Sequence, residues 1–189
     1  LDEPENTLIV SDNGRGIPFD KIELVCTKIQ AGSKFTRESS GSSAGENGVG
    51  LTAINALSEK FEIISKRYGE KASIKFQEGK LVQPLTIKKV NSDKHGTITI
   101  FKTSKFYLGE DCDIPTDELI EWVEKIIHLI PSDVKITLQV NKKGKDASIN
   151  KKYKNKKGLF DYVKKLCKEP LLSPVHIMQS TKLKEYDKG

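Results

Sequence analysis

The sequence has few cysteines, no long apolar run and no initiator methionine. Cys26, Cys112 and Cys167 are the only cysteines among 189 residues. Their odd number, their wide spacing and the absence of a histidine cluster argue against a disulfide framework or a zinc site. A reducing, cytoplasmic setting is the better expectation. No apolar segment approaches the roughly 20 residues that a membrane span requires, so we expect no membrane partner.

The first residues, Leu1-Asp2-Glu3-Pro4, show no signal-peptide pattern. Because a methionine is also missing there, we expect a segment cut from a longer protein. A length of 189 residues favours one domain, with or without a fragment of a second. On folding, a chain of this size buries about 70% of the surface that its unfolded form exposes, so it needs no disulfide or metal to stabilise it.

Positive charge is concentrated in one stretch of the sequence. The net charge is +6, and residues 141–158 contain eight lysines and a single acid, Asp146. A nucleic-acid surface is compatible with this pattern. We favour a solvated, lysine-rich hairpin or loop, because the stretch contains no arginine and Tyr153 is its only aromatic residue.

The hydrophobic pattern predicts strands and helices in clusters, without regular βαβ alternation. Short or alternating apolar runs predict strands at residues 7–11, 61–66, 72–77, 85–90, 97–102 and 134–140. Helical spacing predicts helices at residues 22–29, 47–58, 116–130 and 158–167. Residues 32–45 are rich in Gly and Ser and predict a mobile loop. This order favours an α+β fold in which helices cover one face of a mainly antiparallel sheet.

The segment Asp12-Asn13-Gly14-Arg15-Gly16-Ile17-Pro18 directly follows the first predicted strand. A carboxylate in that position is partly removed from water, which is costly unless a donor such as the adenine amine faces it. Gly14 and Gly16 lack Cβ atoms, so a flat base can lie against the backbone. Pro18 fixes the exit of the turn. An ordinary Asp-Asn-Gly turn is the alternative for the first three residues.

A second segment, Gly45-Glu46-Asn47-Gly48-Val49-Gly50, precedes a predicted helix. The first four N–H groups of a helix have no internal partner, and they attract phosphate. The segment lacks the lysine-serine/threonine ending of a Walker A loop, and no strand leads into it as in a dinucleotide fingerprint. Lys34, at the front of the predicted loop, can swing onto a terminal phosphate. Taken alone, a flexible glycine loop and a solvated lysine explain these features equally well.

Together, the two segments resemble the ATPase domain of type IIA DNA topoisomerases, and are most similar to the B subunits of bacterial gyrase and topoisomerase IV. The first segment is common to a wider superfamily that includes heat-shock chaperones, MutL and sensor histidine kinases. Pieces that resemble the topoisomerases more specifically are Ala31-Gly32-Ser33-Lys34-Phe35, Asn55-Ala56-Leu57-Ser58 and Gly96-Thr97. The resemblance runs in order from residue 5 to residue 180.

The resemblance implies a two-layer sandwich with a mainly antiparallel mixed sheet, known as the GHKL or Bergerat fold. Residues 1–180 would form this domain without its N-terminal helix. Residues 181–189 would begin the linker to a missing transducer domain.

The resemblance also implies an ATP site. Its residues would be Asp12, Gly14, Arg15, Gly16, Ile17, Pro18, Val25, Lys34, Gly45, Glu46, Asn47, Gly48, Val49, Gly50, Leu51 and Thr97. The adenine pocket would be lined by Ile17, Pro18, Val25 and Leu51, and the Thr97 hydroxyl would help to hold adenine. Arg15 and Arg67 match the pocket mouth, where aminocoumarin-type inhibitors bind in relatives.

In this family, ATP closes a dimeric clamp around DNA, and hydrolysis resets it. The implied partners are ATP with Mg²⁺, DNA, the topoisomerase A subunit and a second B subunit. The family's catalytic glutamate and magnesium-binding asparagine precede the strand before Asp12, so both are expected upstream of Leu1. Glu46 also places an acid where phosphates would lie. We therefore expect this chain to bind nucleotide weakly or not at all by itself, and not to hydrolyse it.

Two alternatives remain open. A histidine kinase shares the first segment, although no phospho-accepting helix is visible and Lys34-Phe35 argues against it. A non-enzymatic binding module is the other alternative, because no general base is assigned within the chain.

Overall fold

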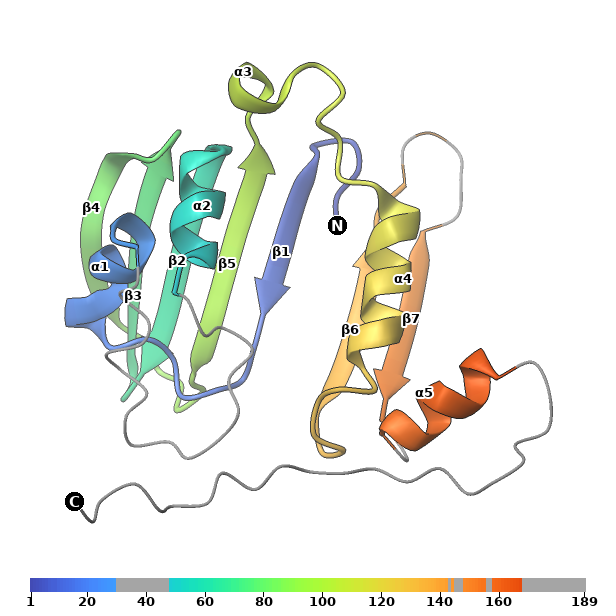
Figure 1. Ribbon diagram of the computed structural model, residues 1–189. Coiled ribbons are helices and arrows are strands. Elements are labelled where there is room, and N and C mark those ends of the chain that lie inside the picture. The colour runs from blue at the N-terminus through green and yellow to red at the C-terminus, as the bar shows by residue number, and fades with distance from the viewer. Residues whose placement is uncertain (30–47, 143, 145–147, 156–157, 168–189) are drawn as a thin grey trace, which may run out of the picture. The chain divides into compact units, whose positions relative to one another are not determined.

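The structure is a computed structural model that describes residues 1–29, 48–142, 144, 148–155 and 158–167. Its elements, in chain order, are β1 (Thr7–Ser11), η1 (Phe19–Lys21), α1 (Ile22–Thr27), α2 (Gly50–Ala56), β2 (Ser58–Arg67), β3 (Glu70–Gln77), β4 (Lys80–Lys89), β5 (Gly96–Thr103), α3 (Lys105–Leu108), α4 (Thr116–Ile126), β6 (Lys135–Val140), β7 (Ile149–Lys154) and α5 (Leu159–Leu166) (Figure 1). The chain divides into two compact units. Unit 1 contains residues 1–115 and 140–149, and unit 2 contains the remainder.

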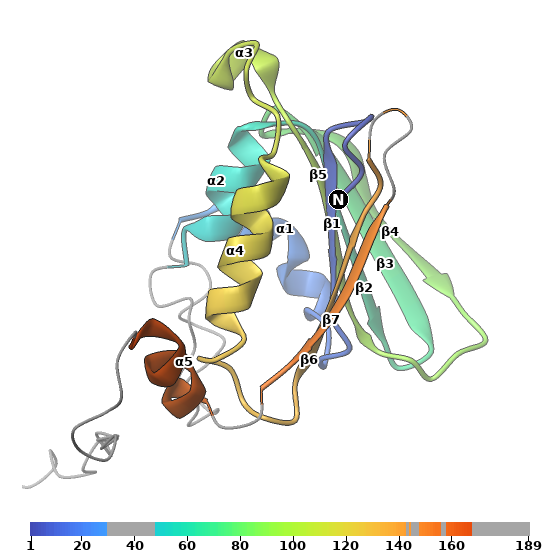
Figure 2. The ribbon, with the colours of Figure 1, turned by 90° about the vertical axis from the view of Figure 1, so that its right-hand side faces the viewer.

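Unit 1 is built on a five-stranded sheet in the order β1-β5-β2-β3-β4. Every neighbouring pair is antiparallel. Helices α1 and α2 lie on the same face of this sheet (Figure 2). The prediction of a mainly antiparallel sheet with helices on one face is therefore confirmed.

The core of unit 1 lies between these helices and the sheet. Its fully or almost fully buried members are Ile22, Cys26, Phe61, Ile63, Ala72, Ile74 and Phe76. The strand members alternate along β2 and β3 because successive side chains of a strand point to opposite faces. On the opposite face, Lys75 of β3 pairs with Glu62 of β2 at 3.5 Å.

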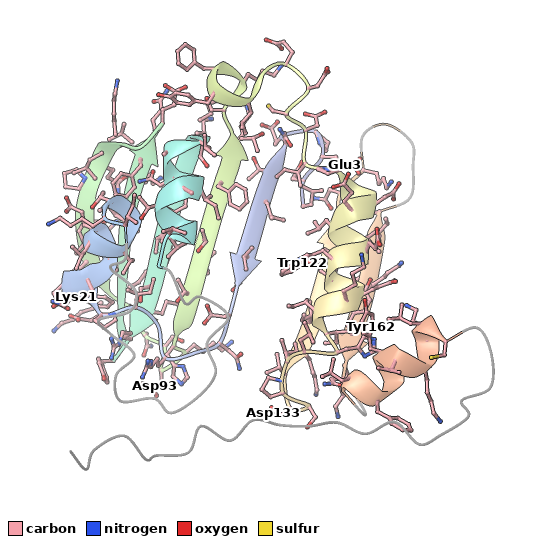
Figure 3. All side chains as sticks on the ribbon, in the orientation of Figure 1. Glu3, Lys21, Asp93, Trp122, Asp133 and Tyr162 are labelled. Carbon is pink, nitrogen blue, oxygen red and sulfur yellow. The ribbon has the colours of Figure 1, made fainter. Side chains whose placement is uncertain are left out.

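Unit 2 combines α4 and α5 with most of the β6–β7 hairpin, whose tip (residues 140–149) belongs to unit 1. The two strands run in opposite directions (Figure 1), and the inward residues of β6 include the buried Leu138. Val123 and Ile127 are the buried side chains of α4 and the turn after it. Tyr162 of α5, labelled in Figure 3, lies 5.4 Å from the His128 ring, measured between ring centroids.

All four predicted helices are shorter than their hydrophobic periodicity predicts, although α5 loses only one residue at each end. The helix expected at 22–29 ends at Thr27, because Lys28 is extended with φ −115° and ψ 127°. The helix expected from residue 47 begins only at Gly50, because Gly48 has φ 58°, which a right-handed helix excludes. After Ile126 the hydrogen bonds tighten, as His128 N–H donates to the Lys125 carbonyl and Leu129 N–H to the Ile126 carbonyl. This tighter turn ends α4 before Ile130.

The remaining predicted elements are present, most of them longer than expected. The sequence pattern does not predict the short elements η1 and α3, because neither contains enough residues to show a period. Residues 32–45 and 181–189, for which the sequence predicts a loop and a linker, lie outside the described residues. No helix in the described part of the chain is long and apolar enough to cross a membrane.

Candidate functional site

The segment from Asp12 to Pro18 is held against the neighbouring strand β5 by hydrogen bonds from the aspartate. Asp12 N–H donates to the Thr97 carbonyl at 2.9 Å. The Asp12 carboxylate accepts two backbone N–H groups through Oδ1, from Gly14 at 2.8 Å and from Thr97 at 3.2 Å. Oδ2 has no partner among the described residues. The backbone therefore fixes the position of the carboxylate through one of its two oxygens.

Gly96 makes the close approach of β5 to Asp12 possible. A Cβ atom at this position would lie 2.1 Å from the Asp12 carbonyl oxygen and 3.1 Å from the Asn13 Cα. Gly96 also has φ 138°, a conformation that L side chains rarely adopt. Only glycine fits here, which explains the Gly-Thr pair at the start of β5.

The side chain of Asp12 is exposed. The expectation that this carboxylate is partly removed from water is therefore wrong. The reason is that β1 is the outermost strand of its sheet, and its residues Ile9 and Val10 are themselves 53% and 54% exposed. The distinguishing property of Asp12 is that two hydrogen bonds fix the position of its carboxylate, which stays exposed to solvent.

Ser65 fastens the second half of the segment to β2. Its fully buried hydroxyl accepts the Ile17 N–H at 2.9 Å and donates to the Ile17 carbonyl at 2.8 Å. A Cβ at Gly16, which has φ 70°, would lie 2.8 Å from the Lys66 carbonyl oxygen. Glycine at position 16 therefore lets the turn lie flat on the end of β2.

Three of the four residues predicted to line the adenine pocket share one apolar surface. Ile17, Val25 and Leu51 are partly buried and pack against the same core cluster. Pro18, the fourth, precedes η1 with φ −54° and directs the chain toward α1. The structure thus gathers the apolar residues on the helix side of the sheet.

Helix α2 lies against α1 through polar side chains. The Asn55 amide donates to the Cys26 carbonyl at 3.0 Å, and the Thr52 hydroxyl lies 3.4 Å from the Val25 carbonyl. The C-terminal end of α2 leads directly into the first residue of β2, whereas Ile17 is fastened near the far end of that strand. The N-terminal end of α2 therefore points toward the side of the sheet along which the segment 12–18 runs (Figure 1).

Gly50, the first residue of α2, has open space around it. A Cβ at Gly50 would meet no atom within 4 Å among the described residues, and Val49 is 42% exposed. The predicted phosphate-side residues Lys34, Gly45, Glu46 and Asn47 lie outside the described residues.

Arg15 and Arg67 line the same pocket, which has a volume of about 450 Å³. Its other lining residues are Asn13, Gly14, Tyr68, Gly69, Asp93 and His95. The Arg67 guanidinium lies 5.0 Å from the Tyr68 ring centroid and donates to the Tyr68 hydroxyl at 3.1 Å. Figure 3 labels Asp93 at the end of the sheet where the chain passes from β1 to α1. The two arginines predicted at a pocket mouth are thus neighbours in space.

The sequence pattern does not predict two contributors to this site. The pattern predicts only that Ser65 lies in a strand. Because Ser65 lies two positions after the buried Ile63, it shares the buried face of that strand, and a polar residue there needs a hydrogen-bond partner inside the protein. His95 carries no motif, yet its Nδ1 lies 2.6 Å from the Gly14 carbonyl oxygen. Because a carbonyl only accepts, the ring nitrogen donates in this contact.

Beneath the site, burial raises the pKa of the Cys26 thiol to about 12, with a smaller contribution from Glu23. This thiol is neutral at physiological pH and is part of the core. Among the described residues, no group of three or more His, Cys, Asp or Glu side chains gathers to hold a metal ion.

The sequence matches the family described as "Histidine kinase-, DNA gyrase B-, and HSP90-like ATPase" over residues 1–105. The chain belongs to this ATPase family. Within the family, it is 34% identical to the B subunit of DNA gyrase from Thermotoga maritima over 190 residues, which cover 95% of this chain and 29% of the relative. It is 37% identical to the B subunit of DNA topoisomerase 4 from Haemophilus influenzae over 113 residues, which cover 55% of this chain and 18% of that protein.

The fold of this ATPase-family chain is also found in a solved relative. The 43K ATPase domain of Thermus thermophilus gyrase B, crystallised with an aminocoumarin, matches 91% of this chain with a TM-score of 0.69 and 24% identity. The match covers 44% of that structure. The predicted fold and the predicted resemblance to gyrase B and topoisomerase IV B ATPase domains are therefore confirmed. The chain spans less than a third of the length of the two relatives named above.

Proposed function

We propose that this chain is the ATP-binding segment of a type II DNA topoisomerase B subunit. The observation that carries the proposal is the fixed Asp12 carboxylate, with Oδ1 held by two backbone N–H groups and Oδ2 left to accept from the adenine amine. Membership of the ATPase family and the resemblance to gyrase B support it.

ATP fits the residues that surround Asp12. Gly14 carries no Cβ that would crowd the Asp12 carboxylate, and Ile17, Val25 and Leu51 offer an apolar wall. Gly16 does not make room for a base as expected from the sequence, because the space beside it is filled by β2. When adenine lies on this wall, the hydrogen bond from its amine to Asp12 is charge-assisted and contributes about 1.5–3 kcal/mol. Thr97 would orient the base through its hydroxyl, while its N–H continues to hold the carboxylate.

The phosphates would lie beyond the start of α2. We propose that Lys34 and the backbone amides of residues 45–50 contact them, because donors fixed in this way stabilise the charge that develops during phosphoryl transfer. ATP supplies the phosphoanhydride bond whose cleavage would reset a DNA clamp. No residue of this chain is assigned as the general base that activates water, so we expect no turnover by the chain alone.

The other parts of the proposal concern the whole protein. By analogy with the gyrase B and topoisomerase IV B relatives, we propose that it acts with Mg²⁺, DNA, an A subunit and a second B subunit in a cytoplasmic enzyme. The free state of Cys26, Cys112 and Cys167 supports a reducing compartment. The mouth formed by Arg15 and Arg67 supports an inhibitor site next to adenine.

Nucleotide binding by wild type and Asp12→Asn tests the central claim. Titration with a non-hydrolysable ATP analogue, followed by NMR so that millimolar affinities are measurable, should show affinity about ten- to a hundredfold weaker for Asp12→Asn. Asp20→Asn is the matched control, because Asp20 is exposed on η1 and its ion-pair partner is Lys21. Equal affinities for wild type and Asp12→Asn would overturn Asp12 as the adenine acceptor. Hydrolysis by this chain at the rate of a complete type II topoisomerase would contradict the expected lack of turnover.

A further inference from the structure

In the strands β6 and β7, the described residues on the outward face include no carboxylate. Exposure alternates along β6, and the outward positions of the two strands are Lys135, Thr137, Gln139, Asn150, Lys152 and Lys154, all of them exposed. We call these six residues the hairpin face. Three of them carry a positive charge, two carry a neutral amide and one carries a hydroxyl, so every side chain on the face is a hydrogen-bond donor.

The lysines of the hairpin face differ from the other lysines around them. Lys151, on the inward side of β7, lies 3.8 Å from Glu124 of α4, and Lys165 of α5 lies 3.7 Å from the same carboxylate. By contrast, Lys135, Lys152 and Lys154 make no ion pair with any described residue. The charge of these three lysines is therefore available to a partner.

The composition of the hairpin face selects the kind of partner. Protein interfaces depend on buried aromatic and apolar anchors and are depleted in lysine, but the hairpin face contains no apolar residue. Single-stranded nucleic acid is bound by stacking of bases on aromatic side chains, and the face contains no aromatic residue. Lysine, threonine, asparagine and glutamine are side chains that contact the phosphate backbone of a duplex.

The spacing of the face also suits a duplex. Outward residues of one strand follow each other at about 7 Å, twice the rise of one residue. Double-stranded DNA carries a negative charge about every 1.7 Å of its axis, so successive lysines of β7 each find a phosphate within reach. The sequence of residues 141–158 alone favours a solvated hairpin or loop, but the hairpin face also includes the outward residues of the neighbouring strand β6. We propose that the hairpin face binds the phosphate backbone of double-stranded DNA, without reading its sequence.

This contact does not depend on the nucleotide site, because Asp12 belongs to unit 1 and the hairpin face belongs to unit 2. The two proposals can therefore fail separately. Asp12→Asn should leave DNA binding unchanged, and neutralising the hairpin face should leave nucleotide binding unchanged.

The test is fluorescence anisotropy with a labelled duplex of about 20 base pairs at about 50–200 mM salt. The variant is Lys135→Gln/Lys152→Gln/Lys154→Gln. The matched control is Lys80→Gln/Lys88→Gln/Lys89→Gln, which removes three exposed lysines from β4 of unit 1. Each lost phosphate contact makes the negative slope of log K against log salt less steep by about 0.9. The slope of the first variant should therefore be less steep than that of wild type by about 2 to 3, and its affinity at low salt should be at least about tenfold weaker. The control variant should show a clearly smaller change in both the slope and the affinity.

Three results would overturn the proposal. The first is equal weakening by both triple variants, which would indicate a response to net charge alone. The second is wild-type binding that is absent at low salt or insensitive to salt. The third is competition by poly-glutamate as effective as by unlabelled duplex, which would show a surface for any polyanion. Circular dichroism of both variants checks that each is folded.

Discussion

The glycines that pack around Asp12 and the glycine that begins α2 have different surroundings. At Gly16 and Gly96, a Cβ would lie within 3 Å of a neighbouring backbone atom, and both residues have positive φ. At Gly50, a Cβ would meet nothing within 4 Å among the described residues. Gly16 and Gly96 are therefore required by close contact with neighbouring backbone, whereas no such contact requires Gly50. Glycine can thus be required at one position because a neighbouring backbone leaves no space for a side chain, and can leave the backbone open to solvent at another.

Alanine substitution at one glycine of each kind should give the largest contrast. Gly96→Ala forces a Cβ against the Asp12 backbone and a disfavoured φ, and we expect a loss of about 3 kcal/mol in the free energy of unfolding. Gly50→Ala, at the first residue of α2, should change it by less than about 1 kcal/mol and in the stabilising direction. Urea denaturation measures both. Similar losses for the two variants would remove the distinction between packed and open glycines.

Removal of the Ser65 hydroxyl should have a smaller effect that is confined to the first segment. Ser65→Ala leaves the Ile17 N–H and carbonyl without partners, which costs about 1–3 kcal/mol. The matched control is Ser73→Ala, because the Ser73 hydroxyl lies in an exposed contact with Thr86 at 3.1 Å, and we expect a loss of less than about 0.5 kcal/mol. Denaturation gives the energies. Hydrogen exchange at the Ile17 amide provides a local measurement. The exchange rate of this amide should increase in Ser65→Ala and stay unchanged in Ser73→Ala.

The pH dependence of stability should distinguish Cys26, on α1 between the two segments, from the exposed Cys167. Burial raises the pKa of its thiol to about 12, above the ordinary thiol value that applies when the chain is unfolded. The folded chain therefore binds this proton more tightly, so the corresponding stability is present below the ordinary thiol pKa and is lost as pH rises toward 12. Urea denaturation of wild type should show a steeper decline above about pH 9 than Cys26→Ala. Cys167→Ser, which changes an exposed cysteine, should keep the wild-type decline, and identical curves for all three proteins would contradict this role of the buried thiol.

The strands of unit 1 were predictable because burial of one face of the sheet requires an apolar residue at every second position. Ile63 and Ile74 show this clearly, since each is fully buried within an alternating run. The end of α4 and the start of α2 were not predictable from periodicity, because apolar spacing continues through the tightened turn after Ile126 and through Gly48. Local backbone conformation decides both boundaries, and hydrophobic spacing does not report it.

The candidate site was predictable in its residue types but not in its environment. The motif around Asp12 indicated an adenine acceptor, and the structure supplies two backbone donors that hold it. Its exposure was not predictable from the motif, because it depends on β1 being the outermost strand of the sheet. Likewise, the contact of His95 with Gly14 joins residues 81 positions apart, a distance over which no local pattern carries information.

The backbone contact between Asp12 and the start of β5 joins positions 85 residues apart in the sequence. The acceptor geometry is thus set by where two strands touch, whatever the length of the chain between them. The turn at Glu78 and Gly79, by contrast, is tied to other elements, because Gly79 N–H donates to the Asn55 carbonyl and Ser104 donates to the Glu78 carboxylate. A protein engineer who grafts a reporter peptide between β1 and β5 should therefore choose a turn without such hydrogen bonds, so that the Asp12 carboxylate stays in place.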